Sequence, residues 1–147
     1  MCKPSASYWM TMADLVEKEL TGSIIGAFYE VYNTLGFGFL EHLYIKALER
    51  ELLARGHLVE REVRVTVMYK GEVLGTQRID MVVDRRVVVE VKSTYELHRA
   101  ATRQGYNYLR ASSLDIGLLL HFGPEPRVHR LICRSRPRTR RSGGRSP

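Results

Sequence analysis

The spacing of apolar residues predicts two helices in the first part of the chain. Apolar residues recur every three or four positions from Ala13 to Leu35 and again from about Leu40 to Arg55, as they do along the buried face of a helix. Gly36 and Gly56 follow these segments, where a glycine with left-handed backbone often ends a helix. Residues 36–38 are therefore expected to form a tight connection between the two helices.

After Gly56 the pattern changes to an alternation with a period of two, which is typical of strands. It predicts a strand from Leu58 to Tyr69 and a returning strand from Val73 to Val83, with a bulge near Gly75. The later elements are predicted in the same way: a strand over 87–92, a helix over 96–111, a short buried strand over 115–122 and an edge strand over 128–132. This order of elements predicts an α/β (α+β) fold in which helices pack on a mixed sheet.

The composition narrows the class of protein. A chain of 147 residues with 44% apolar residues is the size of one domain with one core. No apolar run approaches the roughly 20 residues of a membrane span, and residues 1–12 lack the apolar segment of a signal peptide. Two cysteines are too few for a framework of several disulfides. We therefore expect a cytoplasmic protein without a membrane partner.

The net charge of +7 is concentrated at the C-terminus. Residues 134–147 hold six arginines and no acid, whereas residues 1–133 carry 17 basic and 16 acidic groups. The charge pattern thus predicts a flexible N-terminus over 1–12, a folded domain over 13–133 and a disordered, arginine-rich tail over 134–147. Such a tail could bind phosphate backbones without sequence preference, or it could only aid solubility.

A hairpin between the second and third strands carries the most informative charges. If residues 84–86 form its turn, Val83 pairs with Val87 and Asp80 faces Glu90, with Cβ atoms roughly 5 Å apart. The odd-numbered positions from 79 to 91 outside the turn are all apolar and predict a core face. The even face carries Asp80, Glu90 and, two residues later, Lys92.

Two facing carboxylates repel each other, so a cation or a shared proton should offset the repulsion. Their oxygen atoms are ligands that Mg²⁺ and Mn²⁺ prefer, and Lys92 could position a water molecule beside them. A row of surface salt bridges on an exposed sheet face is the alternative.

Two helical residues are further candidates. Glu41 shares an apolar stripe with Ile45 and Leu48, where a carboxylate is costly unless it is paired, although a helix N-terminus also favours an acid. Gln104 lies one turn before Tyr108 and could orient a phosphate, or it could be an ordinary surface amide. The five histidines show no metal-ligand spacing, and no Ser/His/Asp nucleophile is indicated.

Together these residues resemble a known family. The segment from Gly38 to Tyr44, GFLEHLY, is similar to the signature of the GxxExxY proteins. Asp80 and the segment 90–92, EVK, resemble the D…ExK core of the PD-(D/E)XK nuclease superfamily, in which that family is placed. Gln104 and the strand 117–123 resemble the elements that follow. Ile79, Phe37 and His121 depart from the usual residues, and none of them is a candidate ligand.

The resemblance implies a restriction-endonuclease-like αβββαβ core and a nuclease activity. It implies Mg²⁺ or Mn²⁺ held by Asp80, Glu90 and the Val91 carbonyl, with Glu41 as a helix-borne acid near the metal. It also implies that Lys92 activates water and that Gln104 assists.

We therefore expect a metal-dependent phosphodiesterase that hydrolyses nucleic acid, with DNA favoured. A catalytically silent module on the same fold, binding nucleic acid or protein, is the alternative. The chain offers little room for a separate recognition domain, so sequence specificity would need a homodimer or a partner protein.

Overall fold

The computed structural model describes residues 12–134, so the expectations for residues 1–11 and 135–147 lie outside the described part. Its elements, in chain order, are α1 (Met12–Leu35), α2 (Glu41–Ala54), β1 (Val59–Tyr69), β2 (Glu72–Val83), β3 (Val87–Lys92), α3 (Arg99–Ser112), β4 (Ile116–Phe122) and β5 (Pro126–Ile132). Each corresponds to a predicted element, with ends that differ by three residues at most.

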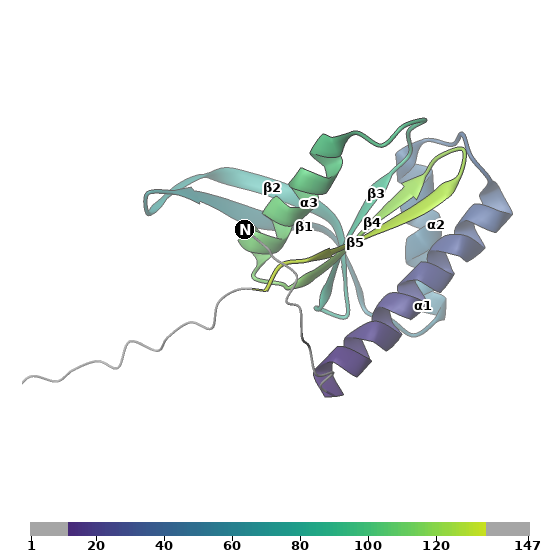
Figure 1. Cartoon of the computed structure of the whole chain (residues 1–147), viewed down its shortest axis with the longest axis horizontal. Helices are drawn as coiled ribbons and strands as arrows, with labels where there is room; N and C mark the ends of the chain where they lie inside the picture. Colours follow the sequence, from purple (N-terminus) through teal and green to yellow (C-terminus); the bar gives the residue numbers. More distant parts are fainter. Residues whose placement is uncertain (1–11, 135–147) are drawn as a thin grey trace, which may run out of the picture.

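One mixed sheet organises the molecule. Its strands lie in the order β1-β2-β3-β4-β5, and neighbours are antiparallel except β3 and β4, which are parallel. Helix α3 connects these two strands, as a parallel pair requires. Figure 1 shows α1 and α2 on one side of the sheet, α3 on the other, and the β1–β2 ribbon extending beyond the remaining strands. The predicted α+β architecture with a mixed sheet is confirmed.

The hairpin register agrees with the prediction from the sequence. Val83 pairs with Val87 and Met81 with Val89, so the odd-length turn over 84–86 is confirmed. Asp84 and Arg85 adopt positive φ angles of 51° and 56° within this turn. A register shift between β1 and β2 falls opposite Gly75, where a bulge was predicted.

Two apolar cores lie on opposite faces of the sheet. The larger core joins α1 and α2 to the odd-numbered positions of β3 and to β4. The smaller core packs α3 onto the other face, where Tyr108 and Leu109 meet Val82 and Val88. One expectation was wrong: Ile79 packs in the smaller core rather than in the larger one. Helix α3 thus covers the even face of the hairpin, and Glu90 on this face is buried.

The helix ends and the aromatic packing hold α2 in place. Gly36 and Gly56 adopt φ angles of 71° and 85°, as expected for glycines that end helices. Tyr44 on α2 stacks on Phe122 of β4 with ring centroids 4.1 Å apart. No helix among the described residues is long and apolar enough to cross a membrane.

Candidate active site

Asp80 and Glu90 lie next to each other on β2 and β3. The carboxylate of each accepts a hydrogen bond from a backbone N–H of the other strand. The Asp80 N–H donates to Glu90 Oε1 over 3.1 Å, and the Val91 N–H donates to Asp80 Oδ2 over 2.8 Å. The regular pairing of β2 with β3 begins one residue later, at Met81 and Val89. At this point the two side-chain carboxylates, and not backbone carbonyl groups, accept the hydrogen bonds between the two strands.

Burial beside a second carboxylate changes the acidity of Glu90. Its side chain lies under α3, and the residue is only 5% exposed. Burial first, and then the charge of Asp80, raise the pKa of Glu90 from 4.5 to about 8, although Lys92 acts in the opposite direction. Near neutral pH the pair consequently holds a proton that a divalent cation could replace.

Lys92 and Gln104 lie near this pair. Lys92 is half-buried at the end of β3, two residues after Glu90 and on the same face. Gln104 Nε2 donates a hydrogen bond of 2.7 Å to the Tyr108 hydroxyl. Burial and the charges of Glu90 and Asp80 raise the pKa of Tyr108. Gln104 is thus held by the hydroxyl of Tyr108, whose pKa responds to the charges of the acidic pair.

Glu41 reaches the same region from α2. Glu41 Oε2 accepts a hydrogen bond of 3.2 Å from the Ser93 N–H, directly after β3. Ser93 Oγ also donates to the Phe39 carbonyl over 2.7 Å. Tyr44 orders the preceding loop, because its hydroxyl donates to the Gly36 carbonyl and accepts from the Phe39 N–H. Glu41 is the acid and Tyr44 the aromatic residue of the GxxExxY pattern. Glu41 therefore binds the loop that follows β3, and Tyr44 binds the loop between α1 and α2.

A cleft connects these side chains. It has a volume of about 560 Å³, and Glu41, Lys92 and Gln104 all line it. The structure thus brings three outer candidates together in the cleft, whereas the two inner candidates, Asp80 and Glu90, contact each other and do not line it.

The chemistry of the inner pair fits a divalent cation. Its donors are oxygen atoms, which suit Mg²⁺ or Mn²⁺, and the negative charge is otherwise offset by a proton. No group of three or more His, Cys, Asp or Glu side chains within residues 12–134 is arranged to hold a metal ion. Glu41 accordingly lines the cleft without completing a three-carboxylate cluster with Asp80 and Glu90.

Comparison with known proteins places this arrangement in a family. The sequence model of the PD-(D/E)XK nuclease superfamily matches residues 18–133. The chain belongs to this superfamily. Among solved structures, that titled "Crystal structure of SSO0001" is similar, with a TM-score of 0.52 and 19% identity over 89% of this chain and 72% of the other. This likeness supports the restriction-endonuclease-like fold, whereas no curated protein matches. The narrower GxxExxY assignment stays a prediction.

The PD-(D/E)XK domain also contains a hydrogen-bonded chain of Ser, His and Asp that was not predicted from the sequence. Ser23 Oγ lies 2.7 Å from His57 Nε2, and His57 Nδ1 lies 2.8 Å from Asp84 Oδ2. Burial raises the pKa of Asp84, but hydrogen bonds from His57 and the Leu58 N–H outweigh it and hold the pKa below 3.8. The three residues are 34 and 27 positions apart along the chain, so no local spacing could have revealed them.

This chain of hydrogen bonds is structural rather than nucleophilic. Ser23 lies in the middle of α1, where backbone N–H groups bond within the helix and cannot form an oxyanion hole. The bonds instead tie α1 to the start of β1 and to the β2–β3 turn. That turn sets the register of the β2–β3 hairpin, whose paired residues end at Met81 and Val89, next to Asp80 and Glu90.

Replacing His57 by alanine should therefore destabilise the domain. Two hydrogen bonds are lost and Asp84 loses its partner, so we expect the free energy of unfolding to fall by about 1–3 kcal/mol. Urea denaturation measures the change. His42→Ala on α2, where the histidine is exposed, is the control and should change stability little. Equal free energies of unfolding for the two variants would show that the hydrogen bonds of His57 to Ser23 and Asp84 do not stabilise the domain.

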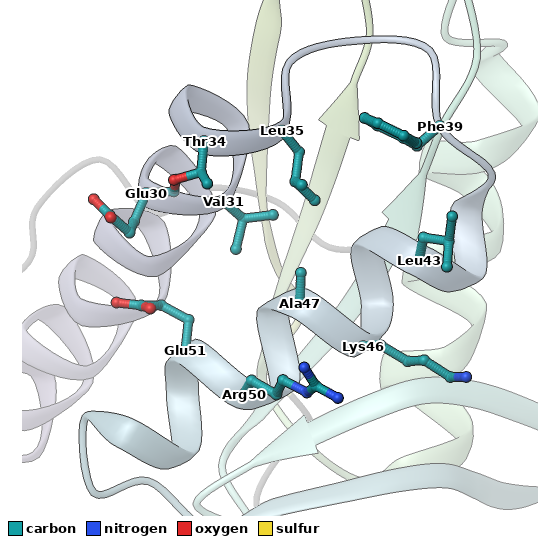
Figure 2. Close-up of a pocket in the computed structure, with 10 residues that line it drawn as sticks. All are labelled: Glu30, Val31, Thr34, Leu35, Phe39, Leu43, Lys46, Ala47, Arg50 and Glu51. Atoms are coloured by element: carbon teal, nitrogen blue, oxygen red, sulfur yellow. The ribbon is translucent and has the colours of Figure 1, made fainter.

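A second cavity, of about 590 Å³, lies between α1 and α2 and is shown in Figure 2. Its lining is mainly apolar, with Val31 and Leu35 on α1 facing Leu43 and Ala47 on α2. Glu30 on α1 lies at its edge. None of the candidate site residues lines this cavity, whereas three of them line the cleft beside β3.

Proposed function

We propose that this PD-(D/E)XK protein is a metal-dependent nuclease that hydrolyses phosphodiester bonds of nucleic acid, with DNA as the favoured substrate. The observation that carries the proposal is the Asp80–Glu90 pair, in which Glu90 is buried and Asp80 is half-buried, close in sequence to Lys92, which lines an open cleft. A buried carboxylate beside a second carboxylate is costly unless a proton or a cation offsets the charge. A structural salt-bridge ladder would not need to bury Glu90.

Each residue has a distinct role in the proposal. Asp80, Glu90 and the Val91 carbonyl would hold Mg²⁺ or Mn²⁺, which when bound neutralises phosphate charge and lowers the pKa of water. Lys92 would orient the attacking water and stabilise the charge that develops on the phosphate. Gln104 would hold its amide toward the cleft through its bond to Tyr108. Glu41 would supply a further carboxylate at the cleft.

A cleavage assay tests the activity directly. Single- and double-stranded DNA and RNA are incubated with the full chain in Mg²⁺, in Mn²⁺ or in EDTA. We expect products with either ion and none in EDTA. Binding without cleavage under every condition would contradict the nuclease proposal and favour a silent binding module on the same fold. Specificity for a sequence would require a second copy or a partner protein.

The arginine-rich tail is expected to strengthen binding through charge alone. Removing residues 135–147, which contain five arginines, should weaken affinity for duplex DNA. The slope of log K against log salt should fall by roughly 0.9 for each arginine that had neutralised a phosphate. The matched controls replace all five arginines by lysine, which should keep the slope, or by glutamine, which should not. An unchanged slope after truncation would leave the tail without a role in binding.

A further inference from the structure

Two exposed aromatic rings stand beside the candidate active site. Phe37 is 43% exposed and precedes α2, and Tyr95 is 74% exposed and follows β3. The rings meet edge to face, with centroids 6.3 Å apart. Phe37 lies four residues before Glu41, and Tyr95 lies three residues after Lys92. The pair therefore bridges the two loops that carry the outer site residues.

The backbones beneath these rings are anchored, although the rings themselves face solvent. The Thr94 hydroxyl donates to the Glu96 carbonyl over 2.7 Å. His121 Nε2 lies 2.8 Å from the Thr94 carbonyl oxygen, and His121 itself is buried. On the other side, the Tyr44 hydroxyl holds the loop of Phe37. Two exposed rings on ordered backbone form a preorganised apolar surface rather than the flexible tip of a loop.

A second cleft continues from this surface. It has a volume of about 620 Å³ and is lined by Tyr95, Arg99 and Arg127 among others. It shares Leu97 and His98 with the cleft that holds Lys92 and Gln104. Lys92 and His121 are also register partners on the parallel strands β3 and β4, so the two clefts lie side by side. Tyr95, Arg99 and Arg127, together with Glu96 and Glu125, thus line a cleft that adjoins the cleft of Lys92 and Gln104.

We propose that Tyr95 and Phe37 form a stacking platform for unpaired bases of the nucleic acid strand that enters the active site, with Arg99 and Arg127 contacting its phosphates. This inference rests on the proposed function and specifies its substrate as single-stranded DNA or RNA, or an unpaired end of a duplex. Bases stack on aromatic side chains without sequence preference, because every base has a π-face. A base inside a duplex has both faces covered by its neighbours and cannot use the platform.

The test measures binding without cleavage. Fluorescence anisotropy in EDTA, at one fixed salt concentration, compares the full chain on single strands of about 15 thymidines, on the same length of uridines and on a blunt duplex. We expect Tyr95→Ala to weaken single-strand binding roughly 5- to 100-fold and to leave duplex binding unchanged. Tyr95→Phe keeps the π-face and should retain the affinity. A loss confined to thymidines or to uridines assigns the platform to DNA or to RNA.

Tyr69→Ala is the matched control, because Tyr69 is also exposed, at 58%, but lies at the far end of the β1–β2 ribbon beside Lys70. This variant should bind single strands like the wild type. Single-strand binding that Tyr95→Ala does not weaken, or an equal loss on single strands and duplex, would overturn the platform. Metal-dependent cleavage by the wild type together with such a result would leave the nuclease proposal standing. Tyr95-dependent binding by a protein that cleaves nothing would support the platform and overturn the nuclease.

Discussion

Replacing Asp80 by asparagine should abolish both cleavage and the response of the protein to Mn²⁺. One of the two inner carboxylates is lost, so we expect cleavage to fall by about 100-fold or more. In the wild type, Mn²⁺ at a hundredfold excess over Kd should stabilise the native state by roughly 2.7 kcal/mol, because it binds only the folded site. Thermal unfolding with and without Mn²⁺ should therefore show an increase in Tm for the wild type and none for Asp80→Asn.

Lys92→Ala separates metal binding from catalysis. An ammonium group is not a metal ligand, so this variant should lose cleavage while it keeps most of the Tm increase in Mn²⁺. The Asp80→Asn protein without metal should be at least as stable as the wild type, because the charge of Asp80 that disfavours ionisation of Glu90 is gone. An identical Mn²⁺ response in the wild type and Asp80→Asn would place the ion elsewhere and remove the centre of the proposed mechanism.

The hairpin of the site was predictable because its geometry is local. An odd-length turn fixes the register of Met81–Val83 with Val87–Val89, so Asp80 and Glu90 could be placed next to each other from their positions in the sequence. The same holds for helix ends at Gly36 and Gly56, where the backbone conformation favours glycine. These conclusions needed no knowledge of how distant segments pack. Alternation could not predict the break at Asp80, where Ile79 turns to the smaller core.

Features that depend on packing between distant segments could not be read from the sequence. The burial of Glu90 follows from α3 crossing the even face of the hairpin, a face that alternation alone would leave open to solvent. The contact of Phe37 with Tyr95 joins residues from two loops 58 positions apart. The chain from Ser23 through His57 to Asp84 needs three elements to meet. In each case the sequence identifies the residues, but it does not show that their side chains lie close together in the fold.

The acidity of Glu90 should make the stability of the metal-free protein fall as pH rises toward 8. With a pKa of about 8 in the native state and 4.5 in the unfolded chain, the native state binds more protons between these values. The free energy of unfolding should therefore decrease through this window by up to about 1.4 kcal/mol per pH unit. Glu90→Gln carries no titrating proton, and its stability should depend much less on pH when both proteins are unfolded in urea with EDTA.

Divalent metal should reverse this dependence, because an ion at Asp80 and Glu90 requires both carboxylates to be ionised. The Mn²⁺-induced increase in stability should consequently grow from pH 6 to pH 8 in the wild type and be absent in Glu90→Gln. Asp80→Asn provides a second check: without the neighbouring charge the pKa of Glu90 should fall, and the pH window of declining stability should narrow from its upper end. Equal pH slopes in the wild type and Glu90→Gln would mean that Glu90 is ionised and solvated in the native protein. A cation would then have no buried proton to displace, and the affinity of the pair for metal would not rise between pH 6 and pH 8.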